Sequence, residues 1–373
     1  MKILFACGGT AGHINPAIAV ANYIRGRHPD CEILFAGNPR GMEARLVPNA
    51  GFQFAPIDIM GFQRQLNWFN VKYNLRSVRC FLLAWGRAKK MIREFDPDVI
   101  VGTGGYVSGP VLREGHKLGY KTVTHESNAF PGVTTKLLAP TTDKMLLAVE
   151  EAKRFLPDNR DYVITGNPVR EQIIFADREK ARGKLGIGDR ICIVSFGGSL
   201  GARRINEAVA GLMAWEGERG GIYHIHATGS YEKDRFPGML KQAGVQNEKN
   251  PNLDIREYIN DMPECLAAAD LVISRSGAIT LSELEASGTA SVLIPSPNVA
   301  ENHQYHNAMV LQNHDAAVVI EEKNLTPQLL RKTVAELCSD PQALRRLGKN
   351  AQKMAVIDAN ERIYTEIMSL LKA

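Results

Sequence analysis

The sequence predicts an α/β protein built from two Rossmann-like domains. Short β-branched runs alternate with longer helical patterns along its 373 residues, as is typical of parallel sheets with crossover helices. Each half begins with an apolar strand, a turn of the pattern Gly-Gly-[Thr/Ser]-x-Gly and a helix, and these turns are Gly8–Gly12 and Gly197–Gly201. We therefore expect two parallel sheets that face each other across a cleft.

The strands are expected at the β-branched runs of each half. In the first half these are Ile3–Ala6, Cys31–Ala36, Val99–Val101 and Lys121–Thr124. In the second half they are Cys192–Phe196, His224–Ala227, Leu253–Glu257, Leu271–Ser274 and Ser291–Ile294. Helices are expected after the two glycine-rich turns, at Pro16–Arg25 and Ala202–Met213.

The domain boundary is expected near Thr165–Pro168, which divides the chain into residues 1–166 and 167–354. The last stretch, Pro341–Ala373, is helical in pattern. It either caps the second domain or returns to the first.

The composition is that of a folded protein with little net charge. Hydrophobic residues make up 45% and charged residues 23% of the chain, and the formal net charge is +5. So small an excess argues against a general nucleic-acid binder, and no apolar run approaches the ~18 residues of a membrane span. The six cysteines form no Cys-x-x-Cys pair, which favours a reducing compartment over a disulfide framework or a zinc ribbon.

Glycine-rich turns between a strand and a helix can hold phosphate. The backbone can approach an anion there, and the helix N-terminus adds unpaired N–H groups and about half a positive charge. Besides the two turns above, Gly102-Thr103-Gly104-Gly105 follows a predicted strand. One such loop often serves only tight packing, whereas three in one chain favour phosphate-bearing ligands.

The details of these loops favour a nucleotide-diphosphate sugar. Neither paired loop has the Gly-x-Gly-x-x-Gly spacing of a dinucleotide site, and Gly37-Asn38 stands where a ribose-binding acid would be expected. The chain also lacks the Gly-Lys-[Ser/Thr] of a P-loop. These features argue against an NAD-dependent enzyme and against ATP hydrolysis of the P-loop kind.

A fourth candidate segment opens a helix after the strand Leu271–Ser274. Glu283 lies about one turn into this helix, where its carboxylate could accept hydrogen bonds from two ribose hydroxyls. The alternative is a helix cap, because Thr280-Leu281-Ser282-Glu283 matches a capping box. Beyond the next strand, Asn302-His303-Gln304 adds polar groups at the edge where doubly wound folds bind ligands.

His13 and Glu126 are the candidates for proton transfer. His13 directly follows the first glycine loop, where a neutral imidazole could take a proton from an attacking hydroxyl. The alternative is that His13 only hydrogen-bonds to the loop. Glu126 and Asn128 follow a strand and could face a cleft, although a lone carboxylate at a strand end is more often structural.

Signals for metal binding are poor. Asp96-Pro97-Asp98 resembles a metal-binding Asp-x-Asp, but its proline favours a turn. His224-x-His226 alternates within a strand, and His303-x-x-His306 has no neighbouring cysteine or acidic ligand. We therefore expect chemistry without a metal.

One segment concentrates the positive charge of the chain. Gly61–Arg93 contains eight Lys or Arg residues and no acidic residue, so the rest of the chain carries 5 − 8 = −3. Its apolar and aromatic residues recur at helical spacing, which predicts a helix that attaches to an anionic membrane surface. Two alternatives are an apolar stripe packed on the sheet with a solvated charged face, and RNA binding, for which no recognisable module is present.

In combination, these segments resemble the MurG family of bacterial N-acetylglucosaminyltransferases. The motifs that carry the resemblance span most of Lys2 to Asn307 and are Gly8–His13, Gly104–Pro110, His125–Asn128, Thr165–Arg170, Gly197–Arg203 and Arg275–Ala278. The resemblance implies the GT-B arrangement of two Rossmann-like domains, with a C-terminal helix at about residues 355–373 that returns to the first domain.

The resemblance also implies the reaction and the partners. The donor would be UDP-N-acetylglucosamine and the acceptor the C4 hydroxyl of undecaprenyl-pyrophosphoryl-N-acetylmuramyl-pentapeptide (lipid I). Transfer would give lipid II with inversion, without a metal or cofactor, and without nucleic acid. The protein would be peripheral, on the cytoplasmic face of the bacterial cell membrane.

Site residues follow from the matching motifs. His13 would be the candidate base, Glu283 would hold the ribose and Ser199 the diphosphate. The acceptor pyrophosphate would contact Gly104, Gly105, Tyr106 and Ser108 together with the first glycine loop. The donor would contact Thr10, Ala11, Gly12, Asn128, Arg170, Ser199, Ile259, Ala278, Ile279, Thr280, Leu281, Ser282, Glu283 and Gln304.

Two positions depart from the family pattern. Ala11 replaces the usual glycine of the first loop, a change that would restrict the backbone dihedral angles there. His303 stands where many relatives carry glutamine. Three rival functions also stay open: a transferase for another lipid such as diacylglycerol, a non-catalytic subunit that binds nucleotide sugars, and an oxidoreductase.

Overall fold

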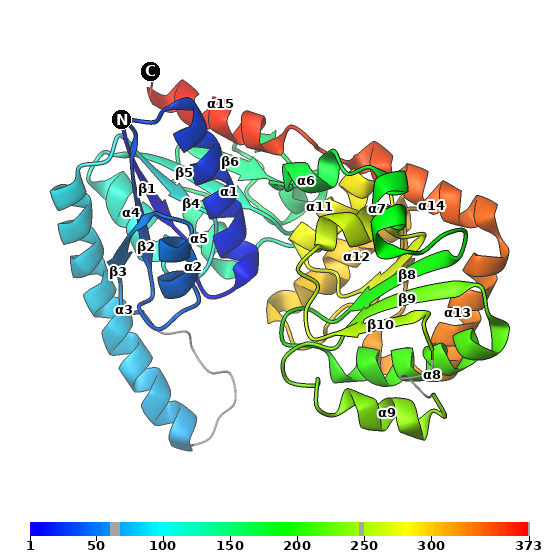
Figure 1. The fold of residues 1–373 in the computed structure, drawn as a ribbon. Helices are drawn as coiled ribbons and strands as arrows, with labels where there is room; N and C mark the ends of the chain where they lie inside the picture. The colour runs from blue at the N-terminus through cyan, green and yellow to red at the C-terminus, as the bar shows by residue number, and fades with distance from the viewer. Residues whose placement is uncertain (60–67, 246–249, 372–373) are drawn as a thin grey trace. The chain divides into compact units, whose positions relative to one another are not determined.

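The computed structural model of the protein (Figure 1) describes residues 1–59, 68–245 and 250–371, with only the backbone described at 68–79, 81 and 82. The chain forms two compact units. Unit 1 consists of Met1–Pro168 and Asp358–Ala373, and unit 2 of Val169–Ile357. The chain therefore leaves the first unit after Pro168 and returns to it for its last helix.

Unit 1 contains a parallel sheet in the strand order β3-β2-β1-β4-β5-β6-β7. The strands are β1 (Lys2–Ala6), β2 (Glu32–Gly37), β3 (Gln53–Pro56), β4 (Val99–Gly102), β5 (Lys121–Glu126), β6 (Lys144–Leu147) and β7 (Tyr162–Ile164). The sequence predicts four of them. It misses β6 and also β3 and β7, which are only partly buried and so lack a continuous apolar run.

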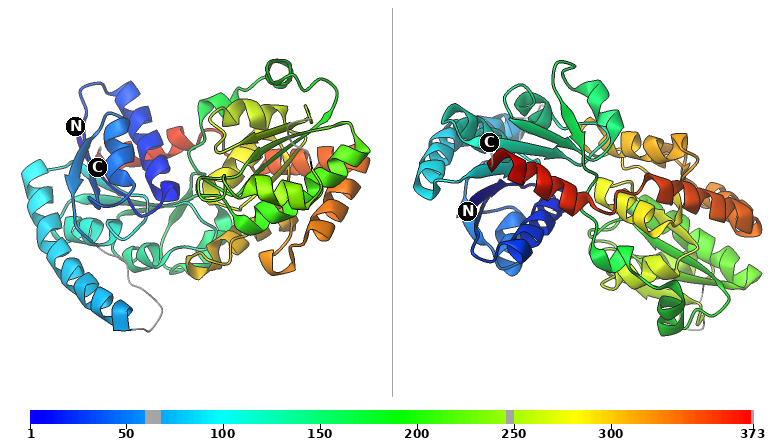
Figure 2. Two further views of the ribbon diagram at one scale, coloured as in Figure 1. Left: turned by 60° about the horizontal axis from the view of Figure 1, so that its bottom comes forward. Right: turned by 90° about the horizontal axis from the view of Figure 1, so that it is seen from above.

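Helices cover both faces of this sheet because successive residues of a strand point to opposite sides. Ile3 and Phe5 of β1 pack with α1 (Ala11–Arg27) and α15 (Ala359–Leu371), whereas Leu4 packs with α3 (Trp68–Phe95) and α4 (Ser108–Lys117). Figure 2 shows the red α15 beside the blue part of the chain that contains α1. The remaining helices of unit 1 are α2 (Glu43–Asn49), α5 (Val133–Leu138) and the 3₁₀ turn η1 (Glu150–Phe155).

Unit 2 contains a second parallel sheet, in the order β10-β9-β8-β11-β12-β13. Its strands are β8 (Ile191–Phe196), β9 (Ile222–Ala227), β10 (Leu253–Arg256), β11 (Leu271–Ser274), β12 (Ala290–Leu293) and β13 (Val318–Val319). Only the two-residue β13 escapes prediction. The described helices of unit 2 are α6 (Glu171–Ile174), α7 (Arg178–Leu185), α8 (Arg203–Arg219), α9 (Phe236–Gln242), α10 (Met262–Ala268), α11 (Ala278–Ser287), η3 (Ala300–Asn302), α12 (His303–Asn313), η4 (Glu322–Asn324), α13 (Pro327–Ser339) and α14 (Pro341–Met354).

Both sheets are thus doubly wound, and the strand order reverses beside β1 in unit 1 and beside β8 in unit 2. The predicted class of two Rossmann-like α/β domains is confirmed. The stretch Pro341–Ala373 forms two helices, of which α14 packs on β12 in unit 2 and α15 on α1 in unit 1.

The expected start of the first helix was wrong. The helix begins at Ala11, five residues before Pro16, and Pro16 lies inside it. Proline costs the helix one hydrogen bond, to the carbonyl of Gly12 four residues earlier, but the preceding turn forms nevertheless. His13 therefore lies within the first turn of α1.

Candidate functional site

Two glycine-rich loops interlock at the carboxyl edge of the sheet in unit 1. β1 and β4 are neighbours, with Ala6 opposite Gly102, so the segments that follow them lie side by side. Gly105 has φ +85°, and a Cβ atom there would collide with the carbonyl group of Gly8. Ser108 Oγ lies 2.7 Å from the carbonyl oxygen of Ala6 and 2.8 Å from that of Gly104. The two predicted phosphate loops therefore form one surface.

His13 is held against the loop that follows β4. Its Nδ1 lies 3.1 Å from the carbonyl oxygen of Thr103, and the Thr103 hydroxyl donates to the carbonyl of His13 at 2.7 Å. A Cβ atom at Gly104 would lie 2.5 Å from Nδ1, so only glycine leaves room for the ring. Because a carbonyl only accepts hydrogen bonds, this contact selects the tautomer with the proton on Nδ1 and a basic Nε2.

Glu43, which the sequence does not single out, lies beneath the first glycine loop. Its side chain is completely buried, Oε2 accepts the N–H of Gly9 at 3.3 Å, and Oε1 accepts the N–H of Asn38 at 2.9 Å. Burial raises the pKa of the nearby Cys7 thiol, and the Glu43 carboxylate raises it further. No local pattern marks this residue, because it meets the loop only when β1 and β2 pair.

The strand-end residues after β5 organise their own loop. One oxygen of Glu126 accepts the backbone and side-chain N–H groups of Asn128, both at 3.0 Å, and the other accepts the N–H of Gly132 at 3.0 Å. The alternative that Glu126 is structural is therefore confirmed. The buried His125 donates from Nε2 to the Gly166 carbonyl at 2.9 Å, and burial lowers the pKa of this imidazole.

In unit 2, the Gly197–Gly201 loop packs on the loop that follows β9. Gly201 has φ +87°, and a Cβ atom there would collide with the carbonyl of Thr228. The carbonyl of Ser199 accepts the N–H of Ser230 at 3.2 Å, while the Ser199 side chain is exposed. The Thr228-Gly229 pair was missed in the sequence, although it directly follows a predicted strand at the edge where ligands bind.

The carboxylate of Glu283 forms an ion pair with Arg170, another predicted donor residue. Arg170 approaches Glu283 Oε1 with Nη2 at 2.8 Å and Nε at 2.9 Å. The capping-box alternative is wrong, because α11 begins at Ala278 with Gly277 as its N-cap and no side chain caps it. Burial raises the pKa of the Glu283 carboxyl, although Arg170 acts in the opposite direction.

The helix that carries Glu283 begins beside the glycine loop of the same unit. β8 and β11 are neighbours, with Phe196 opposite Ser274, so the Gly197–Gly201 loop and the segment leading into α11 emerge together. The predicted contacts of this segment differ in exposure: Ala278, Ile279, Thr280 and Ser282 are half-buried. Leu281 is 4% exposed and its N–H bonds to Gly277, so neither group is available to a ligand.

The other predicted donor residues of unit 2 lie at the same edge. The Ile259 side chain is 2% exposed, so a ligand would meet its backbone. Gln304 Oε1 accepts the N–H of Ser296 at 2.9 Å, which leaves the amide N–H groups for a ligand. His303 contacts the carbonyl of Ala300 through Nδ1 at 2.8 Å.

The weak metal motifs have structural roles. Asp98 accepts the N–H of Lys2 at 2.7 Å, and Asp96 accepts the Tyr120 hydroxyl at 2.8 Å from a turn with φ +52°. In the described part of the chain, no group of three His, Cys, Asp or Glu side chains could hold a metal ion.

His224 and His226 belong to a buried hydrogen-bonded chain between the sheet and α8. Ser195 Oγ lies 2.6 Å from His224 Nε2 and 2.7 Å from His226 Nδ1, and His224 Nδ1 lies 2.9 Å from the Glu216 carboxylate. Burial, and then the charge of His224, hold the pKa of His226 well below its usual range.

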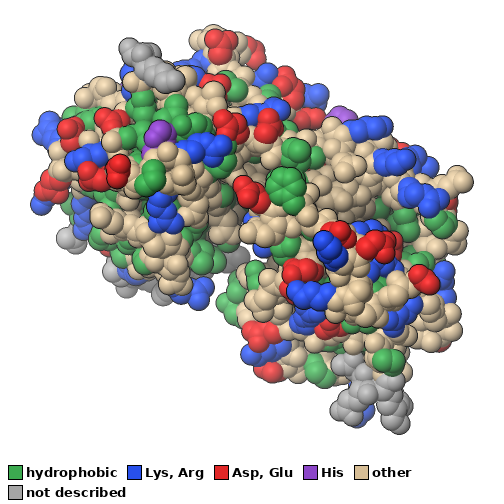
Figure 3. Space-filling view, turned by 45° about the horizontal axis from the view of Figure 1, so that its top comes forward, with side chains coloured by type: hydrophobic (Ala, Val, Ile, Leu, Met, Phe, Trp, Pro, Cys, Tyr) green, Lys and Arg blue, Asp and Glu red, His purple; other side chains and the backbone are tan. Residues whose placement is uncertain are grey.

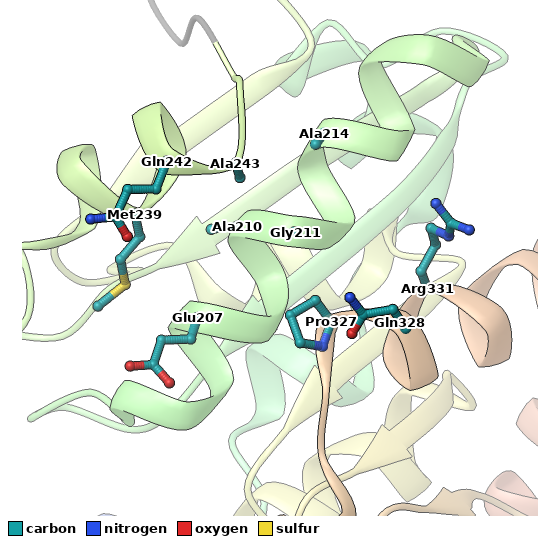
Figure 4. Close-up of a pocket in the computed structure, with 10 residues that line it drawn as sticks. All are labelled: Glu207, Ala210, Gly211, Ala214, Met239, Gln242, Ala243, Pro327, Gln328 and Arg331. Carbon is teal, nitrogen blue, oxygen red and sulfur yellow. The ribbon is translucent and has the colours of Figure 1, made fainter.

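A groove of about 360 Å³ lies elsewhere on unit 2, among α8, α9 and α13 (Figure 4). Small residues of α8 form its floor, and Met239 and Pro327 line it. It contains none of the predicted site residues, so we do not assign it to the site.

Part of the basic segment Gly61–Arg93 lies outside the described residues. This holds for residues 61–67, including Arg64, and for the side chains of Trp68, Phe69, Lys72, Leu75, Arg76, Val78, Arg79, Phe81 and Leu82. In the described remainder of α3, Ala84, Ala88 and Ile92 are buried on the sheet, whereas Arg87, Lys89, Lys90 and Arg93 are exposed. The apolar stripe is thus buried here, and the charges form a solvated face.

The two doubly wound sheets with glycine-rich loops at their carboxyl edges have the GT-B arrangement, and two family models show that the chain is a glycosyltransferase. The model of the glycosyltransferase family 28 N-terminal domain matches residues 3–147, and that of the family 28 C-terminal domain matches residues 192–363. The chain belongs to the MurG family, the UDP-N-acetylglucosamine–N-acetylmuramyl-(pentapeptide) pyrophosphoryl-undecaprenol N-acetylglucosamine transferases.

Full-length relatives carry this assignment. A transferase of that name from Acetivibrio thermocellus is 45% identical over 373 residues, which are 100% of this chain and 99% of the relative. Another, from Ruminiclostridium cellulolyticum, is 38% identical over 100% of both chains. The crystal structure of Acinetobacter baumannii MurG matches with a TM-score of 0.80 and 26% identity over 99% of each chain. The resemblance inferred from the motifs is confirmed.

Proposed function

We propose that this chain transfers N-acetylglucosamine from UDP-N-acetylglucosamine to the C4 hydroxyl of lipid I and so makes lipid II for peptidoglycan synthesis. The observation that carries the proposal is the 45% identity to a transferase of that name over the whole chain. Both glycosyltransferase family 28 domains are also present. The rival acceptor, diacylglycerol, has no comparable support.

Unit 2 would bind the nucleotide. Glu283 Oε1 is engaged by Arg170, which leaves Oε2 to accept a hydrogen bond from a ribose hydroxyl. The exposed Ser199 and the Gly197–Gly201 loop, next to the first turn of α8, would contact the diphosphate. Arg170 is about half-exposed, and it would stabilise the negative charge that develops on the departing UDP.

Unit 1 would supply the base and hold the acceptor. With its Nδ1 proton directed at Thr103, His13 would accept the proton of the C4 hydroxyl on Nε2 while the hydroxyl oxygen attacks the anomeric carbon. The bond to UDP breaks as the new glycosidic bond forms, which inverts the anomeric centre. The acceptor pyrophosphate would contact the surface formed by Gly8–Gly12, Gly104 and Gly105, beside the exposed Tyr106. The expected contact with Ser108 is not part of this proposal, because Ser108 is fully buried and its hydroxyl is used by the carbonyls of Ala6 and Gly104.

A transfer assay tests this function. Purified protein, UDP-N-acetylglucosamine with a radiolabelled sugar and a lipid I analogue should give labelled product without any partner chain. The same rate is expected in the presence of a chelator. Transfer to diacylglycerol instead, or no transfer without a second protein, would contradict the proposal.

We also propose that α3 attaches the protein to the cytoplasmic face of an anionic membrane, where a lipid-borne acceptor must be met. Arg87, Lys89, Lys90 and Arg93 are exposed on α3, whereas Figure 3 shows Lys and Arg interspersed with Asp and Glu over the face in view. Exposed Val133 and Leu137 of α5 add apolar surface to the same unit. No helix in the described ranges is long and apolar enough to cross a bilayer.

A charge-matched pair of variants tests membrane attachment. Each near-surface Lys or Arg contributes about 1 kcal/mol, so the triple variant Arg87→Gln, Lys89→Gln, Lys90→Gln should bind anionic liposomes about 100-fold more weakly at low salt. The control removes three exposed lysines of unit 2: Lys180→Gln, Lys323→Gln and Lys332→Gln. Equal losses in both variants would mean that only net charge matters, and no loss in the first would refute attachment through α3.

A further inference from the structure

Glu43 is a fully buried carboxylate that the mechanism above does not use. It is the first residue of α2, and its oxygens accept the N–H groups of Gly9 and Asn38. Among the described residues, no Lys, Arg or His forms an ion pair with it. A buried carboxylate without a counter-charge is costly to keep, whereas an apolar side chain could fill the same space.

Three glycines make room for this carboxyl group. A Cβ atom at Gly8, Gly37 or Gly41 would collide with the Glu43 side chain. Gly8 follows β1, whereas Gly37 ends β2 and Gly41 follows it. Two separate segments of the chain therefore have glycine where they surround this one acidic group. The arrangement therefore serves the carboxylate itself and the backbone that it binds.

The bound backbone is the loop that leads into α1. Gly9 has φ +86° and its N–H points down to Glu43. The following N–H groups, those of Thr10, Ala11 and Gly12, are the unpaired donors that begin a helix. These three N–H groups could bind an anion above the loop.

We infer that Glu43 is a positioning residue for the pyrophosphate of the acceptor. By engaging Gly9 from below, it holds the loop so that the N–H groups of Thr10–Gly12 point to the surface shared with Gly104 and Gly105. This inference rests on the proposed function for the identity of the acceptor, but the loop geometry can be tested without it.

The variant Glu43→Gln tests the positioning role by kinetics. Glutamine has a single side-chain oxygen, so one of the two backbone N–H groups loses its acceptor. We expect the KM for a lipid I analogue to rise about ten-fold or more, while the affinity for UDP alone, which unit 2 would bind, changes less than two-fold. A merely structural role would lower melting temperature without separating the two substrates.

The matched control is Glu114→Gln, which neutralises another buried carboxylate of unit 1. Glu114 is 9% exposed and pairs with Lys117 on the same helix, α4. Its acceptor KM should stay at the wild-type value. Equal acceptor defects in both variants, or a parallel loss of UDP affinity in Glu43→Gln, would overturn the inference.

A second measurement uses the wild-type protein and does not depend on how the variant folds. Amide hydrogen exchange should show Gly9 protected in the free protein, with Thr10, Ala11 and Gly12 exchanging freely. Inorganic pyrophosphate should slow exchange at those three positions only. Rapid exchange at Gly9 would refute the role of Glu43, whereas absent transfer to lipid I with a protected Gly9 would refute only the assigned function.

Discussion

At the scale of the residue, the three carboxylates of the site differ through their donors. Both oxygens of Glu126 are used by the loop that it organises, and both oxygens of Glu43 by backbone N–H groups. Glu283, in contrast, is contacted by the half-exposed Arg170 through Oε1 alone. Only Glu283 keeps an oxygen for a ligand. The same side chain therefore serves structure or binding according to what surrounds it.

Replacing Glu283 should separate stability from binding. Burial raises the pKa of this carboxyl in the folded chain. Its contribution to the free energy of unfolding is therefore fully present below the pKa of the unfolded chain, about 4.5, and is lost as the pH rises through the pKa of the folded chain. Glu283→Gln should therefore be at least as stable as the wild type at about pH 7 and no more stable at about pH 4. Its affinity for UDP should fall about ten-fold or more. Melting curves at both pH values and UDP titration check this, and a destabilised variant with intact UDP affinity would contradict it.

Ala11 lies in ordinary helical backbone and not in a strained turn. It is the first residue of α1 and does not have a positive φ, so the expected dihedral restriction is absent and the methyl group favours the helix. Ala11→Gly should lower the free energy of unfolding of unit 1 by about 0.5–1 kcal/mol, which denaturant titration measures. The control is Ala214→Gly in α8 of unit 2, a half-buried helical alanine like Ala11, which should leave unit 1 unchanged. A stabilised Ala11→Gly would show that the alanine is strained.

Residues of the site were predictable where their partners are close in sequence. A strand, a glycine turn and a helix are consecutive, so Gly8–Gly12 and Gly197–Gly201 can be recognised from a short window. Glu43 meets Gly8 only after β1 and β2 pair, and Arg170 meets Glu283 across 113 positions. No local pattern encodes such contacts.

At the scale of the element, burial separates most of the predicted strands from the missed ones better than length does. β11 has four residues, all of them buried, and was predicted, whereas β3 has the same length but is only partly buried, as are β7 and β13. The start of α1 was misplaced because a proline usually marks a helix start, and here it lies inside the helix.

The buried hydrogen bonds that link Ser195, the two histidines of β9 and Glu216 make the stability of unit 2 sensitive to acid. His226 has a lowered pKa in the folded chain, so the unfolded chain takes up the proton first, and stability is lost as pH falls below about 6.5. The loss is up to about 1.4 kcal/mol per pH unit for one histidine. His224 and Glu216 remain in His226→Phe, which should be less stable at about pH 7.5 yet lose less stability down to about pH 5.5. Parallel pH profiles of unfolding for the two proteins would contradict this.

At the scale of the whole molecule, α15 connects the end of the chain to the first unit. Ile363 and Ile367 are buried in the same cluster as Ile14 and Phe5, and Tyr364 lies 2.8 Å from His28 through its hydroxyl. The class of fold was predictable because both halves repeat one pattern. The destination of the last helix does not follow from its own pattern, because its apolar face is compatible with either unit. Its return to the first unit was implied by the resemblance to the family alone.

Removing the contacts of α15 should weaken unit 1 alone. Ile363→Ala with Ile367→Ala deletes two fully buried side chains, at about 2–5 kcal/mol each. We expect the calorimetric transition of unit 1 to fall by more than about 10 °C, while that of unit 2 stays in place. Thr365→Ala, an exposed position on the same helix, is the control. A shift of the unit 2 transition instead would show that α15 stabilises the other unit.

The return of α15 also sets an order of events during synthesis. Unit 2 is one continuous segment, Val169–Ile357, and can complete its core once that segment has left the ribosome. Unit 1 begins to emerge first but lacks Asp358–Ala373 until that segment has been made, after the whole of unit 2. The half that is made first is therefore the half that matures last, and until then its sheet exposes the apolar strip that the final helix will cover.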